Sequence, residues 1–567
     1  MDQKVSLLSF KFKKYQLNQE TILHKILLLA LFFPLAIFAK SERPNIIFFI
    51  VDDYDKLDCS LYTGPKGLTP SMERLAKNGI TFDRMHMTST VCTPSRYTCM
   101  TGRYPGNSYS PQYLEDCPKG TQGLPAFNLG LENDNMNVAQ VLSDNGYVTG
   151  LVGKYHVGST HGLGPEKNTP YSDKVNEQKY KAEKHGRELI KKRGFDWAKN
   201  VYMGNLKSPF NTHNPEWTTA AALEFVTENK NKPFFLYYGT TLSHGTPKGW
   251  DKSLDEPLIT GEGRIKKPIG NMNRDTVRSR VAAIGLDPAE KGGILWMDDS
   301  LGALLDRLEE LGIADNTLIC FVADHGSKGK ASLHGIGTEV PCIISWPAAM
   351  KKNVRCGELV QSTDFVATWF DIAGAKLPEK YLLDGISFKS LFQNPTQKHR
   401  DYVYCENGPA RAIKTKDWNY VALRYTKEHL EAMESSKNYA KRLLGLSGGI
   451  GRSFMKPEAL EYDQLYNLSS DSDEMKNLAL NPEYAPKVKE MQVVLTKKLK
   501  TFPERPYGEF IPGPNTLGKG DFDIILDSLK NLRPSDGSKP TKKKKGKKKD
   551  KENKDDNKKK DKKKKNK

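Results

Sequence analysis

The feature that most constrains the fold is a continuous apolar run that ends in an acidic residue, and it occurs twice. The first run, residues 45–51, is followed directly by Asp52 and Asp53, and the second, residues 316–323, ends at Asp324. Runs of β-branched and aromatic residues without polar alternation are typical of strands buried on both faces, as in parallel sheets. In open α/β sheets, the carboxyl ends of such strands face the ligand crevice. The two runs therefore predict a parallel sheet with acidic residues at its carboxyl edge.

Two further apolar runs lead to basic or histidine side chains. Residues 147–152 precede Lys154 and His156, and residues 233–239 precede His244. Taken alone, each side chain has an ordinary explanation, such as a basic loop or a surface histidine. Since strand ends of one parallel sheet lie together, the four runs jointly indicate an α/β fold with one polar site.

A cysteine-containing segment, residues 92–103, lies between the apolar run at residues 45–51 and the one at residues 147–152. Pro94 and Ser95 suit the first turn of a helix, and Gly102 suits the position just after its end. Cys92 would then lie at a helix N-terminus, where free N–H groups and the helix dipole favour an anion. For this pattern alone, a buried structural cysteine is the alternative interpretation.

The segment resembles the signature of type I sulfatases, which belong to the alkaline phosphatase superfamily. In that family the cysteine is oxidised after translation to formylglycine, an aldehyde whose hydrate is the nucleophile. Cys99 and Met100 replace a pair of leucines, and Glu339 stands where the family has an arginine. The residues that match are Cys92, Pro94, Ser95, Arg96, Thr101, Gly102 and Arg103.

The resemblance spans residues 43–500 and implies a metal site. Residues 324–326 are similar to the family's Asp-Asn/His-Gly metal motif. Oxygen ligands favour Ca²⁺ or Mg²⁺, and the family precedent favours Ca²⁺. The implied metal ligands are Asp52, Asp53, Cys92 after conversion, and Asp324, with His325 at or beside the metal.

The resemblance also implies a set of catalytic residues. Residues 153–158 are similar to the family's Gly-Lys-x-His, and residues 328–333 to its Gly-Lys-x-Ser/Thr-Leu. Lys328 competes with Lys330 for the role of the lysine that contacts sulfate. The implied catalytic residues are Cys92, Arg96, Lys154, His156, His244 and Lys330.

The fold implied by the resemblance is α/β, with a large mixed, mostly parallel sheet sandwiched by helices. Alternating runs after residue 401 indicate a smaller C-terminal α+β subdomain with an antiparallel sheet. The implied function is hydrolysis of an aryl or carbohydrate sulfate monoester. Its partners would be a sulfated small molecule or polysaccharide and a formylglycine-generating or sulfatase-maturating enzyme. A phosphonate or phosphate ester hydrolase and a non-catalytic acidic-glycan-binding protein remain open alternatives.

The two ends of the chain differ from its body. Residues 1–40 read as a signal peptide cleaved near Ala39, or as a retained anchor, which predicts a secreted or periplasmic protein. We assign residues 41–400 to a catalytic domain, 401–510 to the C-terminal subdomain, and 511–567 to a linker and a Lys-rich disordered tail.

Charge and cysteine content limit the possible functions. From residue 539 onward, 18 Lys face 5 acidic residues, and the two ends together leave only about +2 of the net charge of +19 for the body. A nucleic-acid-binding core is therefore not expected, although the basic tail could contact anionic glycan or the cell envelope.

Conversion of Cys92 leaves seven of the eight cysteines, so at least one thiol is unpaired. Residues 161–200 look like a polar insertion, and 248–290 look loop-rich.

Overall fold

The computed structural model describes residues 43–158, 162–245, 249–424 and 462–505. The expected signal peptide and the Lys-rich tail lie outside these ranges. Within them, no helix combines the length and the apolar character needed to cross a membrane.

The core of the molecule is an eight-stranded sheet, with strand order β10-β2-β9-β8-β1-β5-β3-β4. All its described strand pairs are parallel except the two that β9 makes with β2 and β8. This is the predicted mixed, mostly parallel sheet. Its strands are β1 (Asn45–Val51), β2 (Gly79–His86), β3 (Val148–Lys154), β4 (Trp197–Tyr202), β5 (Phe234–Gly239), β8 (Thr317–Ala323), β9 (Cys342–Ser345) and β10 (Val354–Gln361).

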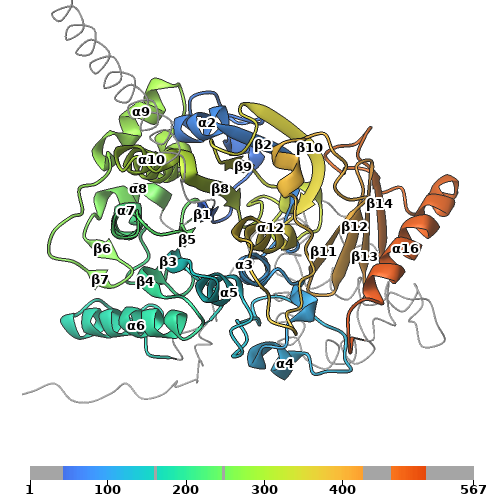
Figure 1. Cartoon of the computed structure of the whole chain (residues 1–567), viewed down its shortest axis with the longest axis horizontal. Helices are drawn as coiled ribbons and strands as arrows, with labels where there is room; N and C mark the ends of the chain where they lie inside the picture. Colours follow the sequence, from blue (N-terminus) through green and yellow to red (C-terminus); the bar gives the residue numbers. More distant parts are fainter. Residues whose placement is uncertain (1–42, 159–161, 246–248, 425–461, 506–567) are drawn as a thin grey trace, which may run out of the picture. The chain divides into compact units, whose positions relative to one another are not determined.

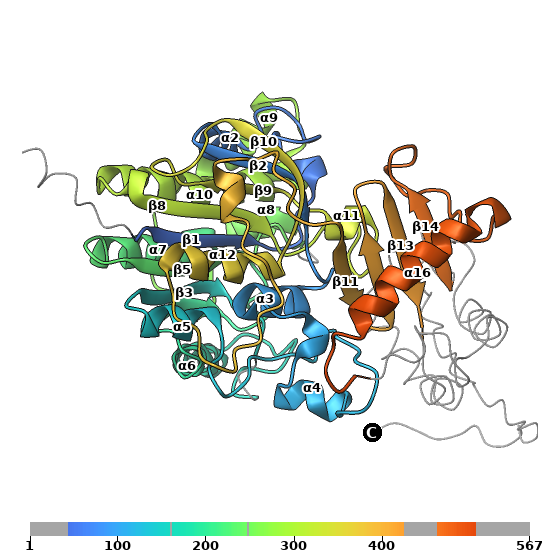
Figure 2. The ribbon, with the colours of Figure 1, turned by 45° about the vertical axis from the view of Figure 1, so that its right-hand side comes forward.

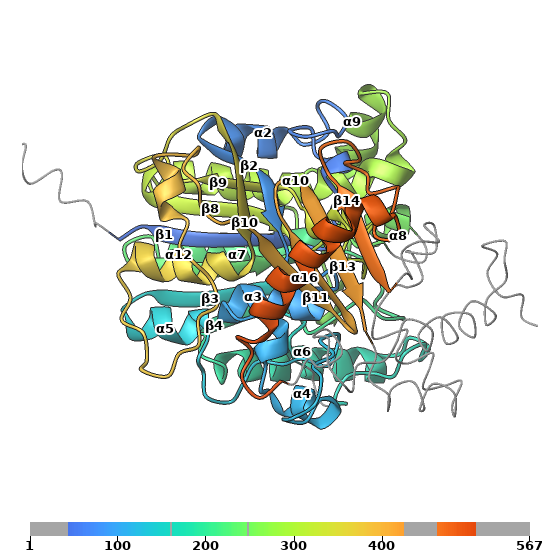
Figure 3. The same ribbon diagram turned by 90° about the vertical axis from the view of Figure 1, so that its right-hand side faces the viewer.

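Helices cover both faces of this sheet, as Figures 1 and 3 show. One face carries α2 (Pro70–Lys77), α7 (Pro215–Glu228) and α10 (Pro288–Glu310). The other carries α3 (Cys92–Thr101), α5 (Val138–Asp144) and α12 (Thr363–Ala373). With both faces covered, all residues of β1, β5 and β8 are buried, which explains their unbroken apolar sequences.

Two segments contain more regular structure than their sequences predicted. Residues 161–200 include the long helix α6 (Asp173–Lys191) and β4, so part of the expected insertion is an edge strand of the central sheet. Two adjacent polar residues at its centre, the half-buried Lys199 and the buried Asn200, hid the strand. Residues 248–290 hold α8 (Gly249–Asp255), β6 (Ile259–Thr260), β7 (Gly263–Arg264), α9 (Val277–Ala283) and the first turn of α10.

A second, antiparallel sheet follows, as predicted. Its strands are adjacent in chain order: β11 (Val403–Asn407), β12 (Ala410–Lys414), β13 (Trp418–Leu423) and β14 (Asp463–Asn467). Helix α16 (Ala485–Leu499) packs on it through Met491, Leu495 and Leu499 (Figure 2). The remaining short elements are α4 (Pro111–Asp116), α11 (Gly335–Thr338), and 3-10 turns at Lys56–Asp58, Pro105–Asn107, Arg274–Thr276, Ala314–Asn316, Lys389–Phe392 and Pro482–Tyr484.

Candidate active site

Four strand ends meet at the carboxyl edge of the central sheet. Val51 is level with Ala323 on β8, and Ile50 is level with Gly239 on β5, which in turn is level with Gly153 on β3. The next residues therefore lie together: Asp324 donates its backbone N–H to the Val51 carbonyl at 2.9 Å. The four predicted runs do converge on one place.

Two glycines make this convergence possible. Gly153 has a φ of 78°, and a Cβ there would lie 1.9 Å from the Gly239 carbonyl oxygen. A Cβ on Gly239 would lie 2.9 Å from Nη1 of Arg96. Side chains at these positions would separate β3 from β5 and displace the guanidinium.

Helix α3 places Cys92 at this edge. Cys92 is the first residue of the helix and is fully buried, and the helix ends at Gly102, whose φ is 68°. The helix is anchored to the end of β8 because the Ser95 hydroxyl donates a hydrogen bond to the carbonyl of Asp324, the residue after that strand, at 2.5 Å. Both predicted ends of the helix, and the N-terminal position of Cys92, are thus seen in the structure.

The loop before Cys92 is held by the second sheet. The backbone N–H of Glu406 on β11 donates to the Thr88 carbonyl at 2.7 Å, and Ser89 Oγ donates to Asn407 Oδ1 at 3.1 Å. From the other side, Ala331 N–H donates to the Thr90 carbonyl at 2.9 Å. The second sheet therefore supports the position of Cys92.

Carboxylates and a histidine surround the Cys92 thiol. His325 Nε2 lies 3.3 Å from Cys92 Sγ and 3.1 Å from Asp53 Oδ1. Cys92 also groups with Asp52 and Asp324, whose ligand atoms lie within 4.8 Å of one another and of the thiol. Asp52 Oδ1 is buried and accepts no hydrogen bond from the described residues. Closely spaced buried carboxylates with a spare oxygen fit a hard divalent cation.

Three cationic side chains neutralise these carboxylates. Lys330 Nζ lies 2.8 Å from Asp53 Oδ1 and 3.7 Å from Cys92 Sγ. Lys154 Nζ forms an ion pair with Asp52. Arg96 Nε donates to Asp324 Oδ2 at 2.9 Å, and its Nη1 donates to the Lys154 carbonyl at 3.1 Å.

Burial and these charges set the protonation states. Burial alone would raise the pKa of Asp52, but the charges around it, Lys154 first and then His244, Arg96 and Lys330, together outweigh burial and hold that pKa well below its usual value. Burial, together with the Asp52 charge, raises the pKa of the Cys92 thiol well above its usual value. The unmodified thiol is therefore protonated and is a poor nucleophile.

The two predicted histidines lie on the open side of the site. His156 is half-buried, has a φ of 58°, and Nδ1 has no hydrogen-bond partner among the described residues. Burial, with the Lys154 charge, holds the pKa of His156 well below 6.5, so the ring is neutral at pH 7. The side chain of His244 is 28% exposed, and Nε2 lies 3.7 Å from Asp53 Oδ2.

Lys330, but neither Lys328 nor Glu339, lies at the Cys92 cluster. The ammonium group of Lys330 points to Asp53 and Cys92, whereas Lys328 contributes its backbone N–H to Asp55. Glu339, in place of the family's arginine, forms an ion pair with Lys56 and lies 3.4 Å from Nε2 of His86, and it does not enter the Cys92 cluster.

Sequence reasoning missed three residues that contact the predicted set. Asn205 Oδ1 accepts a hydrogen bond from Lys154 Nζ at 2.7 Å, and the hydroxyl of Tyr237 lies 3.4 Å from Arg96 Nη1. Phe127 is 44% exposed, and its ring centroid lies 6.0 Å from that of His156. Tyr237 lies in the apolar run of β5, where it reads as core, and Asn205 and Phe127 lie in loops without a pattern.

The family model described as sulfatase matches residues 44–375, more than half of the chain. The chain belongs to the sulfatase family. A second model, described as the C-terminal part of N-sulphoglucosamine sulphohydrolase, matches residues 323–438. The protein is therefore an enzyme that hydrolyses sulfate esters.

Named relatives of this sulfatase act on diverse compounds. It is 28% identical to an ulvan-active sulfatase of Formosa agariphila, over 79% of this chain and 78% of the relative. It is 24% identical to an N-acetylgalactosamine-6-O-sulfatase of Bacteroides thetaiotaomicron, over 80% and 93% of the two chains. Human arylsulfatase A is 25% identical over 67% of this chain and 73% of its own.

Solved structures share the fold of the sulfatase. A sulfatase from Pseudoalteromonas sp. matches with a TM-score of 0.52 at 19% identity, over 82% of this chain and 91% of its own. A protein in complex with its substrate D-glucosamine-2-N,6-O-disulfate matches with a TM-score of 0.51 at 20% identity, over 81% and 98% of the two chains.

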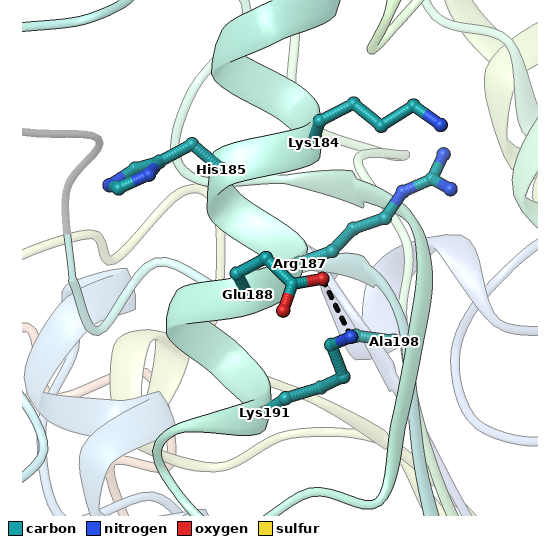
Figure 4. A pocket seen from close by; sticks show the side chains of 6 residues that line it. All are labelled: Lys184, His185, Arg187, Glu188, Lys191 and Ala198. Atoms are coloured by element: carbon teal, nitrogen blue, oxygen red, sulfur yellow. Dashed lines mark ion pairs between the residues drawn. The ribbon is translucent and has the colours of Figure 1, made fainter.

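Two hollows of the sulfatase lie along α6, and only one reaches the site. A cavity of about 360 Å³ is lined by His156 and by Asn205, the partner of Lys154. The other hollow lies on the helix surface; among its lining residues, Lys191 pairs with Glu188 at 2.6 Å (Figure 4). The first cavity is the better candidate for substrate, because it adjoins His156.

Proposed function

We propose that this sulfatase cleaves an aryl or carbohydrate sulfate monoester at residue 92, after Cys92 has been converted to formylglycine. The observation that carries the proposal is the position of Cys92. It lies at the N-terminus of α3, within reach of Asp53 and His325, with Lys330 3.7 Å away. Its raised pKa argues against catalysis by the thiol itself.

The cation site would be formed by Asp52, Asp53, Asp324 and residue 92, with His325 at or beside the ion. Asp52 Oδ1, which accepts no hydrogen bond from the described residues, and the oxygen-rich donors fit a hard cation, Ca²⁺ by the family precedent or Mg²⁺ as the alternative. When bound, such a cation would polarise the sulfate and lower the pKa of a ligated hydroxyl.

The basic residues would bind the sulfate group itself. A sulfate monoester carries anionic oxygens that repel a nucleophile, so charge neutralisation in the transition state is the main requirement. The ammonium groups of Lys154 and Lys330 pair with Asp52 and Asp53 next to residue 92. The guanidinium of Arg96 is held in place by its ion pair with Asp324. The free N–H groups at the start of α3 add to this positive potential.

The histidines would move the protons. The formylglycine hydrate supplies one hydroxyl to attack sulfur and a second whose deprotonation expels sulfate. His244, on the exposed side, would protonate the departing alcohol, with Lys330 assisting. His156, neutral at pH 7, would remove the proton of the second hydroxyl.

Substrate and location follow from weaker observations. Relatives named for ulvan and for N-acetylgalactosamine 6-sulfate favour a sulfated carbohydrate over a simple aryl sulfate. We further propose export to the periplasm or the medium, guided by residues 1–40, where a maturating enzyme would act on Cys92. The Lys-rich tail would contact anionic glycan or the cell envelope.

The test is turnover of nitrophenyl sulfate by Cys92→Ala and Cys92→Ser. Both should lose nearly all activity, because alanine has no group that can be oxidised to the aldehyde and a serine that is not oxidised has only one hydroxyl. Cys99→Ala, about two turns further along the same buried helix, is the matched control and should retain turnover. Near wild-type turnover by either Cys92 variant would refute the mechanism. Faster turnover of nitrophenyl phosphate than of nitrophenyl sulfate by the wild type would instead favour a phosphate ester hydrolase.

A further inference from the structure

The cavity lined by His156 is also lined by two lysines. Lys179 on α6 and Lys207 in the loop after β4 line it, together with Glu183. Its volume of about 360 Å³ falls within the roughly 300–1,000 Å³ that is usual for small-molecule sites. A group bound at the lysines would therefore share one cavity with a group bound beside His156.

The one acidic side chain in the lining does not neutralise these lysines. Glu183 Oε1 accepts hydrogen bonds from Arg187 Nε at 2.7 Å and from the Val201 N–H at 3.0 Å. Among the described residues, neither Lys179 nor Lys207 forms an ion pair or a side-chain hydrogen bond. The lysines of the cavity are therefore only partly compensated, by the charge of Glu183 on Lys179, and the lining keeps a net positive charge.

The protonation equilibrium of Lys179 agrees with this shortage of partners. Burial lowers the pKa of Lys179 to about 8, and the Lys207 charge adds to the effect although Glu183 opposes it. A bound anion would stabilise both ammonium groups and reverse the shift.

We propose that Lys179 and Lys207 bind a second oxyanion of the substrate, so that the sulfatase prefers sugars that carry another anionic group besides the sulfate it removes. This rests on the proposed function, because it assumes that the sulfate is cleaved beside His156. The second oxyanion is a further sulfate on the same sugar or the carboxylate of a neighbouring uronate, since both present the same charge and acceptors to an ammonium group.

The experiment compares substrates in pairs that differ by one anion. Glucosamine 6-sulfate is paired with glucosamine 2-N,6-O-disulfate, and N-acetylgalactosamine 6-sulfate with its uronate-containing disaccharide. The measured quantity is the ratio of kcat/KM within each pair. We expect the wild type to favour the doubly charged member of at least one pair, and that pair identifies the source of the oxyanion.

Two variants and a control locate the effect. Lys179→Ala and Lys207→Ala should each lower the ratio about tenfold or more, mainly through KM, because a charge-assisted hydrogen bond is lost. Lys179→Arg, which keeps a positive charge, should recover part of the kcat/KM ratio between the two members of a pair. Lys207 is exposed, so its substitution leaves the fold intact even if Lys179→Ala does not fold. Lys184→Ala, on the same helix but in the surface hollow of Figure 4, should leave the ratio unchanged.

Failure of this proposal is distinguishable from failure of the proposed function. Calorimetric binding of the same pairs to the Cys92→Ala protein needs no turnover and gives the same comparison. The proposal is wrong if no pair favours its doubly charged member in binding or turnover, or if the ratio survives both lysine substitutions. Absence of sulfate release from every ester, nitrophenyl sulfate included, would instead contradict the proposed function.

Discussion

Lys330 Nζ lies 2.8 Å from Asp53 Oδ1 and 2.9 Å from Asp53 Oδ2, so one ammonium group covers both oxygens of a proposed metal ligand. The same ammonium lies 3.7 Å from Cys92 Sγ. A cation that binds Asp53 would therefore share this carboxylate with Lys330, and the proposed function would then place Lys330 beside both the ion and the sulfate.

Removal of the metal should abolish activity and lower the melting temperature. Without a cation, three buried carboxylates at one place repel each other, and the sulfate charge is less neutralised. Chelation should reduce turnover of nitrophenyl sulfate at least about 100-fold, and added Ca²⁺ should restore both turnover and the melting temperature. Asp52→Asn should lose the Ca²⁺-dependent gain in melting temperature.

Asp299→Asn is the matched control for this prediction. Asp299 lies on α10 and pairs with Arg280, away from Cys92. It should keep the Ca²⁺-dependent gain. Full activity after thorough chelation would exclude the proposed metal site.

The protonation state of His156 predicts the acid limb of the pH profile. Because burial and Lys154 hold the pKa of His156 well below 6.5, its neutral, proton-accepting form should persist as the pH falls from 7 to 6. The acid limb of kcat for nitrophenyl sulfate, which includes the expulsion of sulfate, should therefore have its midpoint below 6.5. A midpoint at or above 6.5 that disappears in His156→Ala would show that the site does not lower this pKa.

His156→Ala should also separate the two halves of the reaction. Release of the alcohol does not need His156, but expulsion of sulfate does, so the alcohol should appear in a single burst. Sulfate release should slow by about 10²–10⁴-fold, the usual contribution of a general base. His185→Ala, on the surface of α6, should behave as the wild type. Release of both products in step by His156→Ala would argue for another base.

Asp298 should make stability depend on pH in a defined direction. Its carboxylate accepts hydrogen bonds from Ser71 and Met72 at the start of α2, and burial raises its pKa to about 7. Since this folded-state value exceeds the unfolded value of 3.8, the stabilisation is complete below pH 3.8 and is lost as the pH rises towards 7.

Chemical denaturation of the wild type and Asp298→Asn at pH 5 and pH 8 tests this sign. The free energy of unfolding of the wild type, relative to the variant, should be about 2–3 kcal/mol lower at pH 8 than at pH 5. A relative stability that rises with pH would mean that the N–H groups of α2 favour the carboxylate more than burial disfavours it.

The sequence predicted those parts of the fold whose residues are buried on both sides. The runs that end at Asp52 and Asp324 are strands of the central sheet, and their fully apolar character follows from the helices on both faces. Strand β4 was missed because it is a short edge strand with two adjacent polar residues at its centre, and it follows α6, whose apolar residues are few.

The site was predictable where a residue directly follows a strand or belongs to the Cys92 segment. Asn205 and Phe127 were not, because each reaches the site from a loop and only the folded chain brings it there. The two lysines of the cavity, Lys179 and Lys207, were not predicted either. They belong to a segment with many charged residues, and its sequence does not distinguish these two from the others.

The most direct test of the central claim is mass spectrometry of the peptide that contains residue 92, from protein produced in its native host. The account predicts that Cys92 has lost its sulfur and carries an aldehyde that reacts with a hydrazide, while Cys99 in the same helix remains a thiol. A fully reduced Cys92 in protein that turns over nitrophenyl sulfate at its full rate would contradict it.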